Sequence, residues 1–177
     1  MSTTETRQAL PTGTWNADPV HSELGFAIDY MAGTFRGTFS TFEARVADGR
    51  LEGAAEVASV QVKDAMLEAH LQSPEFFDVA RHPRLTVAAD EITRAGSEVT
   101  ISGEITIRGH TEPVELRGTI TDPIEDPYGN ERFGLRLKTR VDRTRFGLNW
   151  NAQLPTGRPA LSDDVEIAAE LQFVREA

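Results

Sequence analysis

Hydrophobic and polar residues alternate along most of this chain with a period of two, as in β-strands that have one dry and one wet face. The clearest run is residues 99–109, VTISGEITIRG, where Val99, Ile101 and Ile105 share a face opposite threonine, serine and glutamate. The alternation resumes after the turn HTEP with Val114 and Leu116. The two runs predict a pair of antiparallel strands.

Comparable spacing recurs in several other segments, and turns rich in glycine and proline separate them. These segments are ELGFAIDYM (23–31), TFRGTFSTFEARV (34–46), FGLRLKTRV (133–141) and DVEIAAELQF (164–173). In the second of them the apolar phase changes near Ser40, which predicts a bulge or bend. The count is about eight strands. No alternation of strands with helices favours a parallel sheet.

The predicted fold is therefore all-β, an extended eight-stranded antiparallel β-barrel, with a β-sandwich of similar strand number as the alternative. Closure into a barrel removes exposed strand edges and encloses an interior that holds packed side chains or one small ligand. Glycines inside the predicted strands favour the barrel, because strong bending and close backbone approach tolerate residues without a Cβ atom. They are Gly37, Gly103, Gly118 and Gly134.

A helical insertion interrupts the strand pattern between residues 64 and 83. In KDAMLEAHLQS, Met66, Leu67, His70 and Leu71 fall on one side of a helix, and Asp64 can cap its first turn. The following SPEFFDVARHP begins again with a serine cap and a proline at the first helical position, and ends before a second proline. The spacing predicts two short helices packed against an open end of the barrel.

Charge and composition argue against several classes of function. The chain has 177 residues, 18 Lys+Arg against 28 Asp+Glu, and a net charge of −10, which opposes nucleic acids and anionic membrane surfaces. It has no cysteine, so disulfides and thiolate chemistry are excluded. We expect no nucleic-acid partner.

The first residues, MSTTETRQALPTG, contain neither a cationic region nor an apolar run of the kind found in secretory signals. No stretch approaches the roughly 18 apolar residues that a transmembrane helix needs. We expect a cytoplasmic protein with a disordered tail over residues 1–12 and one domain over residues 13–177.

Five motifs in order resemble those of the YceI-like family, the polyisoprenoid-binding lipocalin-like barrels. They are WNADPVHSELGF (15–26), EAHLQSPEFFDVARHPRLTV (68–87), GEITIRGHTEPVEL (103–116), RTRFGLNW (143–150) and LSDDVEIAAEL (161–171). The resemblance implies a barrel whose interior holds a long isoprenoid or another amphiphilic lipid, and it suggests a homodimer. Many relatives are exported, whereas this sequence shows no export signal, and Leu67-Glu68 stand where the family has Arg-Asp.

The inward faces and the helical insertion supply the candidate ligand-binding residues. From alternation alone these side chains would fill a solid core, and the family resemblance favours a ligand tunnel instead. Methionine and aromatic rings suit an uneven apolar tail. The candidates are Phe26, Ile28, Tyr30, Phe35, Phe39, Met66, Leu67, His70, Leu71, Phe76, Phe77, Ile105, Ile107, Leu135, Leu137, Phe146 and Trp150.

Three functions are compatible with these residues. The first is a non-enzymatic barrel that sequesters or carries a quinone, prenyl diphosphate or fatty-acid derivative, with His70 or Arg36 near the polar head. The second is an enzyme that cyclises or isomerises an apolar substrate, using Tyr30, Asp29 or His70 as an interior acid. The third is an assembly module with a filled barrel.

The four histidines lack the short spacing that places two metal ligands on one helical face. We therefore expect no metal, no cofactor and no catalytic residue. Buried hydrogen-bonding roles are the expectation for His21 and His70.

Overall fold

The computed structural model describes residues 9–177. Its helix α1 spans Ala65–Gln72, and its short 3₁₀ helices are η2 (Pro19–His21), η3 (Val57–Ser59) and η4 (Arg143–Phe146). The strands are β1 (Thr14–Ala17), β2 (Glu23–Tyr30), β3 (Gly33–Phe39), β4 (Phe42–Ala47), β5 (Arg50–Glu56), β6 (Val60–Gln61), β7 (Arg84–Ala95), β8 (Glu98–Ile107), β9 (His110–Ile120), β10 (Ile124–Glu125), β11 (Glu131–Asp142) and β12 (Leu161–Arg175).

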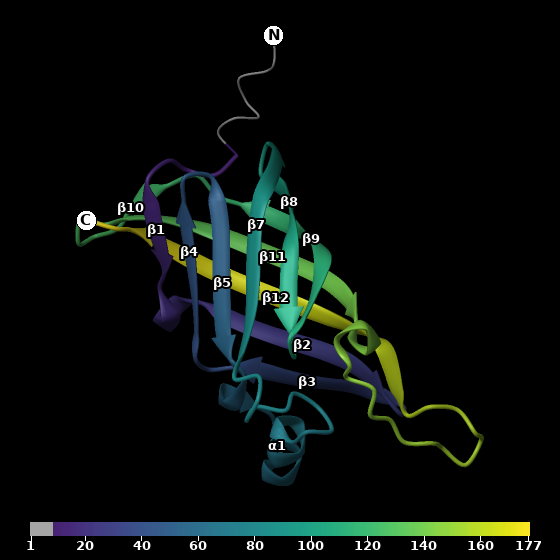
Figure 1. Ribbon diagram of the computed structural model, residues 1–177. Helices are drawn as coiled ribbons and strands as arrows, with labels where there is room; N and C mark the ends of the chain where they lie inside the picture. Colours follow the sequence, from purple (N-terminus) through teal and green to yellow (C-terminus); the bar gives the residue numbers. More distant parts are fainter. Residues whose placement is uncertain (1–8) are drawn as a thin grey trace.

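The strands form a closed antiparallel barrel of eight strands, as the sequence predicts. The order β11-β9-β8-β7-β5-β4-β1-β12 is closed by the pairing of residues 132–142 of β11 with residues 164–174 of β12. Figure 1 shows β4, β5, β7 and β8 side by side across the diagonal β11 and β12. Closure gives these strands partners on both sides and encloses an interior.

Three of the strands are broken in the middle. β12 pairs with β1 near its end and with β2 over residues 161–170, so β1 and β2 lie along the same edge. β3 pairs with β2 and β6, whereas β4 pairs with β1 and β5. The segments β1/β2, β3/β4 and β5/β6 therefore each act as one bent strand, and the bend at Ser40 and Thr41 is the predicted phase change.

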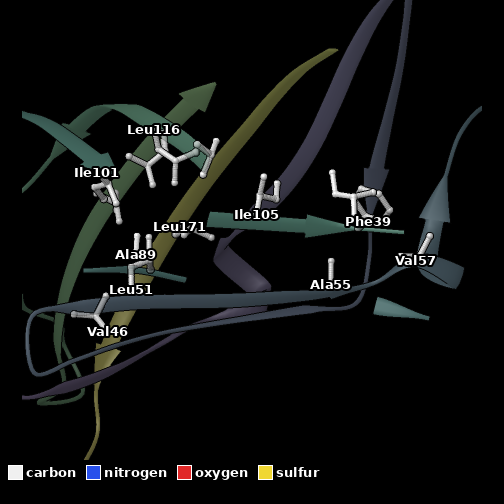
Figure 2. Close-up of a cluster of buried hydrophobic side chains, with 14 of the residues drawn as sticks. Phe39, Val46, Leu51, Ala55, Val57, Ala89, Ile101, Ile105, Leu116 and Leu171 are labelled. Atoms are coloured by element: carbon white, nitrogen blue, oxygen red, sulfur yellow. The ribbon is translucent and has the colours of Figure 1, made fainter. Parts of the chain in front are cut away.

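The apolar positions of the alternating pattern form the buried face of the strands. Val99, Ile101, Ile105 and Ile107 of β8 are all buried. Figure 2 shows Ile101 and Ile105 facing the interior together with Leu116 of β9 and with residues of β4, β5, β7 and β12. These side chains belong to one hydrophobic core.

The strands approach closely at two of the predicted glycines. A Cβ atom at Gly118 in β9 would overlap the carbonyl oxygen of Arg136 in β11. One at Gly103 in β8 would overlap the backbone of Ala88 and Ala89 in β7. The close approach that favoured a barrel is therefore present at both positions.

The helical insertion contains one helix rather than the predicted two. Asp64 caps α1, because its side chain accepts a hydrogen bond from the backbone of Met66 at 2.8 Å. The second helix does not form: the amides of Phe77 and Val79 donate back to the carbonyls of Leu71 and Gln72. Residues 73–82 are a series of turns that satisfy the last carbonyls of α1, which a helix end leaves without partners.

The expected disordered tail, residues 1–12, falls largely outside the described residues. Within the described part, Ala9 and Leu10 are each 5% exposed, and Leu10 belongs to the core. Packing against the barrel therefore begins before residue 13.

Candidate functional site

An apolar cavity of about 180 Å³ lies inside the barrel, at the end that β2, β3 and the first half of β12 enclose. A second apolar cavity, of about 100 Å³, lies further along the interior. Leu24, Leu85 and Ile167 line both cavities. The interior of the barrel is thus hollow along part of its length, and this argues against the alternative of a completely filled core.

Two segments far apart in the sequence cover the larger cavity. One is the helical insertion, and the other is the segment that follows η4, residues 147–160. His70 packs edge-on against Phe76 and Trp150, with ring centroids 4.9 and 5.0 Å apart, and Phe76 lies 5.4 Å from Trp150. Aromatic contacts of this geometry are favourable, so the cluster joins the two covering segments.

Arg108 ties the same two segments together. This residue lies in the turn between β8 and β9 with a φ angle of 52°. Its Nη2 donates to the carbonyl oxygen of Pro74 at 2.8 Å, and its Nη1 donates to the carbonyl oxygen of Gly147. Charge-assisted hydrogen bonds are stronger than neutral ones, so Arg108 stabilises the closed arrangement of the cover.

Most of the predicted ligand-binding residues come together at the larger cavity. Thirteen of them line it: Phe26, Ile28, Tyr30, Phe35, Phe39, Leu67, His70, Leu71, Phe76, Phe77, Ile107, Phe146 and Trp150. Ile105 and Leu137 line the second cavity. Leu135 is fully buried in the core and lines neither.

Met66 is placed differently from its prediction, because it is 83% exposed on α1. Leu67 and Leu71, one turn apart, face the cavity. Met66 is rotated by about 100° from Leu67, since an α-helix has 3.6 residues per turn. Met66, Leu67, His70 and Leu71 thus span a wider arc of α1 than the face that packs against the barrel.

The polar candidates separate into two groups. Tyr30 and His70 line the larger cavity. Arg36 lies on a separate groove lined by residues of β2, β3, β9, β11 and β12, several of them charged. Asp29 is exposed and accepts a weak hydrogen bond from Thr34. Arg36 is therefore not positioned to meet a head group in the cavity, and Asp29 is not an interior acid.

Several lining residues were missed by the sequence analysis. Most lie on apolar faces that the alternation already indicates, so that signal could have found them. The missed residues are Leu24, Gly25, Leu85, Val141, Arg143, Leu148, Leu161, Val165 and Ile167.

Arg143 is the missed residue with the clearest chemistry. Its side chain is 3% exposed, and burial lowers the pKa of its guanidinium. Nε donates to the carbonyl oxygen of Ser162 at 2.8 Å, and Nη1 donates to those of Leu148 and Trp150 at 2.6 and 2.8 Å. Arg143 therefore holds the covering segment 147–160 against the start of β12.

The motif around His21 forms a polar network instead of a ligand site. The expectation of a buried His21 is wrong: its side chain is 58% exposed and its Nδ1 lies 2.9 Å from Oδ2 of Asp18. Asp18 also accepts from Nη1 of Arg132, which holds the pKa of the Asp18 carboxyl down at about 2. Asp126 accepts from Nε of the same arginine, and its pKa is likewise about 2.

Within residues 9–177, no three histidine, aspartate or glutamate side chains gather as metal binding would require. None of the helices in the same range is long and apolar enough to cross a membrane.

A closed antiparallel barrel with an apolar interior and a helical cover defines a lipocalin-like barrel. The YceI-like domain matches residues 15–173, and the chain belongs to that family. It is similar to a UPF0312 protein of Pectobacterium atrosepticum, 29% identical over 80% of this chain and 71% of that protein. It is also similar to Protein YceI of Salmonella newport, 26% identical over 88% of this chain and 83% of that protein.

Solved structures share the fold. BcnA of Burkholderia cenocepacia superposes with a TM-score of 0.75 at 22% identity, covering 88% of this chain and 98% of BcnA. A polyisoprenoid binding domain from Saccharophagus degradans superposes with a TM-score of 0.68 at 12% identity, covering 92% of this chain and 98% of that domain.

Proposed function

We propose that this protein binds an isoprenoid-like or other amphiphilic lipid, with the tail in the apolar cavities of the barrel. The observation that carries the proposal is the hollow interior. Thirteen of the ligand-binding residues predicted from the sequence line its larger cavity. Membership of the YceI-like family supports it, as does the likeness to a domain described as polyisoprenoid binding.

The energetics of such a ligand favour the interior. A tail that buries several hundred Å² at about 25 cal/mol/Å² gains on the order of 10 kcal/mol before the cost of ordering the chain. Leu24, Leu85 and Ile167 line both cavities, so the two cavities are neighbours in the interior and a long tail could extend from one toward the other.

Binding is better supported than catalysis. Of the three acids that an isomerase or cyclase would use, Asp29 is exposed outside the cavity. Tyr30 and His70 line the cavity, and within residues 9–177 no carboxylate lines it with them. Glu75, whose Oε1 lies 3.3 Å from Nε2 of His70, is outside the lining. The hollow interior also speaks against an assembly module with a filled barrel. Dimerisation stays a prediction, which light scattering on the purified chain would check.

The first experiment asks what occupies the barrel. Native mass spectrometry of the purified protein, followed by organic extraction, should show a lipid in stoichiometric amount. Added prenyl alcohols and fatty acids should quench or shift the emission of Trp150, which lines the cavity. Replacing Trp150 by Phe should remove that signal, because Trp15 lies in the core outside either cavity.

A blocking variant makes the test specific. Leu85→Trp adds an indole ring at a residue that lines both cavities, so lipid uptake should fall by about tenfold or more as tail burial is lost. Met66→Trp adds the same ring at an 83% exposed position and should leave uptake unchanged. Equal uptake by both variants, or no uptake by the unmodified protein, would overturn the proposal.

A further inference from the structure

Arg143 is a buried cation in the wall of an apolar cavity. Its side chain is 3% exposed, and it lines the larger cavity. A guanidinium keeps its charge in proteins and carries five N–H donors. A buried charge is costly unless hydrogen bonds and an opposite charge compensate it. The question is whether this protein supplies that compensation itself.

The hydrogen bonds of Arg143 account for part of its donors. Nε donates to Ser162, and Nη1 donates to Leu148 and Trp150, all through backbone carbonyl oxygens. These bonds use three of the five N–H groups. The remaining two belong to Nη2, which is buried and has no hydrogen-bond partner among residues 9–177. Buried polar groups rarely lack a partner, so a ligand acceptor at Nη2 would satisfy these donors.

The charge of Arg143 is also poorly balanced. Oδ1 of Asp163 lies 4.0 Å from Nη2, beyond hydrogen-bond distance, and its side chain is 66% exposed. Oδ1 of Asp142 accepts from the amide and the hydroxyl of Thr144, at 3.0 and 2.6 Å. Within residues 9–177, no aspartate or glutamate lines the larger cavity. An anion from outside the chain would complete the pair.

The other polar side chain that was nominated for a head group is less available. Nε2 of His70 lies 3.3 Å from Oε1 of Glu75, and its ring is packed against Phe76 and Trp150. Arg143 therefore combines a fixed charge with free donors, whereas His70 already has a carboxylate partner.

We propose that Nη2 of Arg143 recognises the head of the ligand, and that this head is a single carboxylate on a long fatty or prenyl chain. This inference rests on the proposed function, because it assumes that a lipid tail occupies the cavity. It assigns a specificity-determining role to a residue that otherwise only holds the covering segment.

A single carboxylate matches Arg143 better than a diphosphate. Bidentate recognition of a carboxylate or a phosphate uses two nitrogens of the guanidinium fork, and Nη1 and Nε are already occupied. Nη2 alone can therefore hold one anionic oxygen, and a carboxylate brings one negative charge to the one positive charge of Arg143, whereas a diphosphate would bury further charge without partners. Nη2 is enclosed, so binding of the carboxylate at this nitrogen requires the neighbouring chain to shift.

The direct test compares hexadecanoic acid with its methyl ester on the unmodified protein. Both have the same tail, and only the acid has a charged head at neutral pH. We expect the acid to bind about tenfold or more tightly, as for a hydrogen bond to a charged group. Equal affinities would overturn the role of Arg143 and leave lipid binding standing. Binding of neither ligand would overturn both.

A second measurement locates the head group. Hexadecanoic acid labelled with ¹³C at the carboxyl carbon should titrate, when bound, with a pKa about one unit or more below its value in neutral detergent micelles, because a nearby cation favours the charged form. An unchanged or raised pKa would place the carboxyl away from Arg143 and overturn the inference.

Substituting Arg143 itself would also release the covering segment, so the matched variants act on its neighbour. Asp163→Asn removes the carboxylate that competes at 4.0 Å, and should tighten acid binding by about two- to fivefold without affecting the ester. Asp164→Asn makes the same change in net charge at the next exposed position and should have no effect. Equal effects of the two variants, or none from Asp163→Asn, would contradict the inference.

Discussion

The two ends of the barrel use aromatic residues in opposite ways. At the end that contains β1, Trp15, Phe133 and Phe173 are 0–1% exposed and pack at centroid distances of 4.9 and 5.0 Å. At the other end, Phe26, Phe35 and Trp150 are partly exposed and surround a cavity. One end is a solid core that stabilises the fold, and the other encloses the larger cavity.

The strand pairing explains the difference. Around β1 the ring β11-β9-β8-β7-β5-β4-β1-β12 is continuous, so inward side chains from many strands converge. Beyond the bends, β3 pairs with β6 over two residues, and the helical insertion separates β6 from β7. At this end the wall is therefore completed by α1 and the segment after η4. The cavity lies between these two segments and the strands.

The largest expected effect comes from opening the solid end. Phe133→Ala should destabilise the protein by about 3–5 kcal/mol, because it leaves a cavity in a fully packed core. Phe77→Ala, at the partly exposed wall of the cavity, should cost about 1–2 kcal/mol. Urea unfolding of both variants checks the comparison. A larger loss from Phe77→Ala would show that the two ends contribute to stability in the reverse order.

Acid should weaken a network that joins β11, the turn between β10 and β11, and the segment after β1. Arg132 lowers the pKa of Asp18 and of Asp126 from 3.8 to about 2. A carboxyl whose pKa is lower in the folded state stabilises the fold above its unfolded pKa, and this contribution is lost as pH falls through the folded value. Stability should therefore decline between about pH 4 and pH 2, by a modest amount because solvent screens these groups.

Thermal unfolding of Arg132→Met at a series of pH values tests that prediction. The variant should be less stable than the unmodified protein at pH 6 and should lose less of its remaining stability between pH 4 and pH 2. Parallel profiles for the two proteins would contradict the assignment of this pH dependence to Arg132.

The smallest effect on stability, with a clear effect on binding, should come from the cover. Arg108→Met removes the link between Pro74 and Gly147, so the bound lipid should dissociate about 3- to 10-fold faster while the melting temperature changes little. Stopped-flow displacement measures the rate. Arg145→Met, at an exposed pair with Glu112, is the control and should leave the rate unchanged. Equal rates for both variants would show that Arg108 does not hold the cover closed.

The predicted residues that line the cavity come from regular strands, from the helical insertion and from the segment around η4. Period-two spacing placed Phe26, Ile28 and Tyr30 on one face of β2, and all three line the cavity. The insertion was recognised by its break in this period, and its Asp64 cap is present. The absence of the second helix was not predictable in this way. The amides of residues 77 and 79 donate to carbonyl oxygens at the end of α1, and these contacts form only on folding.

The hidden role of Arg143 shows where local patterns fail. In the sequence it is one of two arginines in RTRFGLNW, and charge alone favours exposure for both. The structure buries Arg143 and leaves Arg145 exposed. Only the meeting of η4, the segment after it and β12 supplies the three carbonyl partners that allow burial of Arg143.

The sequence by itself determined the strands, the dry faces, the bend near Ser40 and the family, because alternation, turn residues and motifs are properties of neighbours along the chain. The tertiary structure decided which dry faces pack solidly and which surround a cavity, because that depends on whether strands distant in sequence meet or leave a gap. It also decided that Arg143 lies at the wall with two donors free, since burial and hydrogen bonding are settled by segments that come together only on folding.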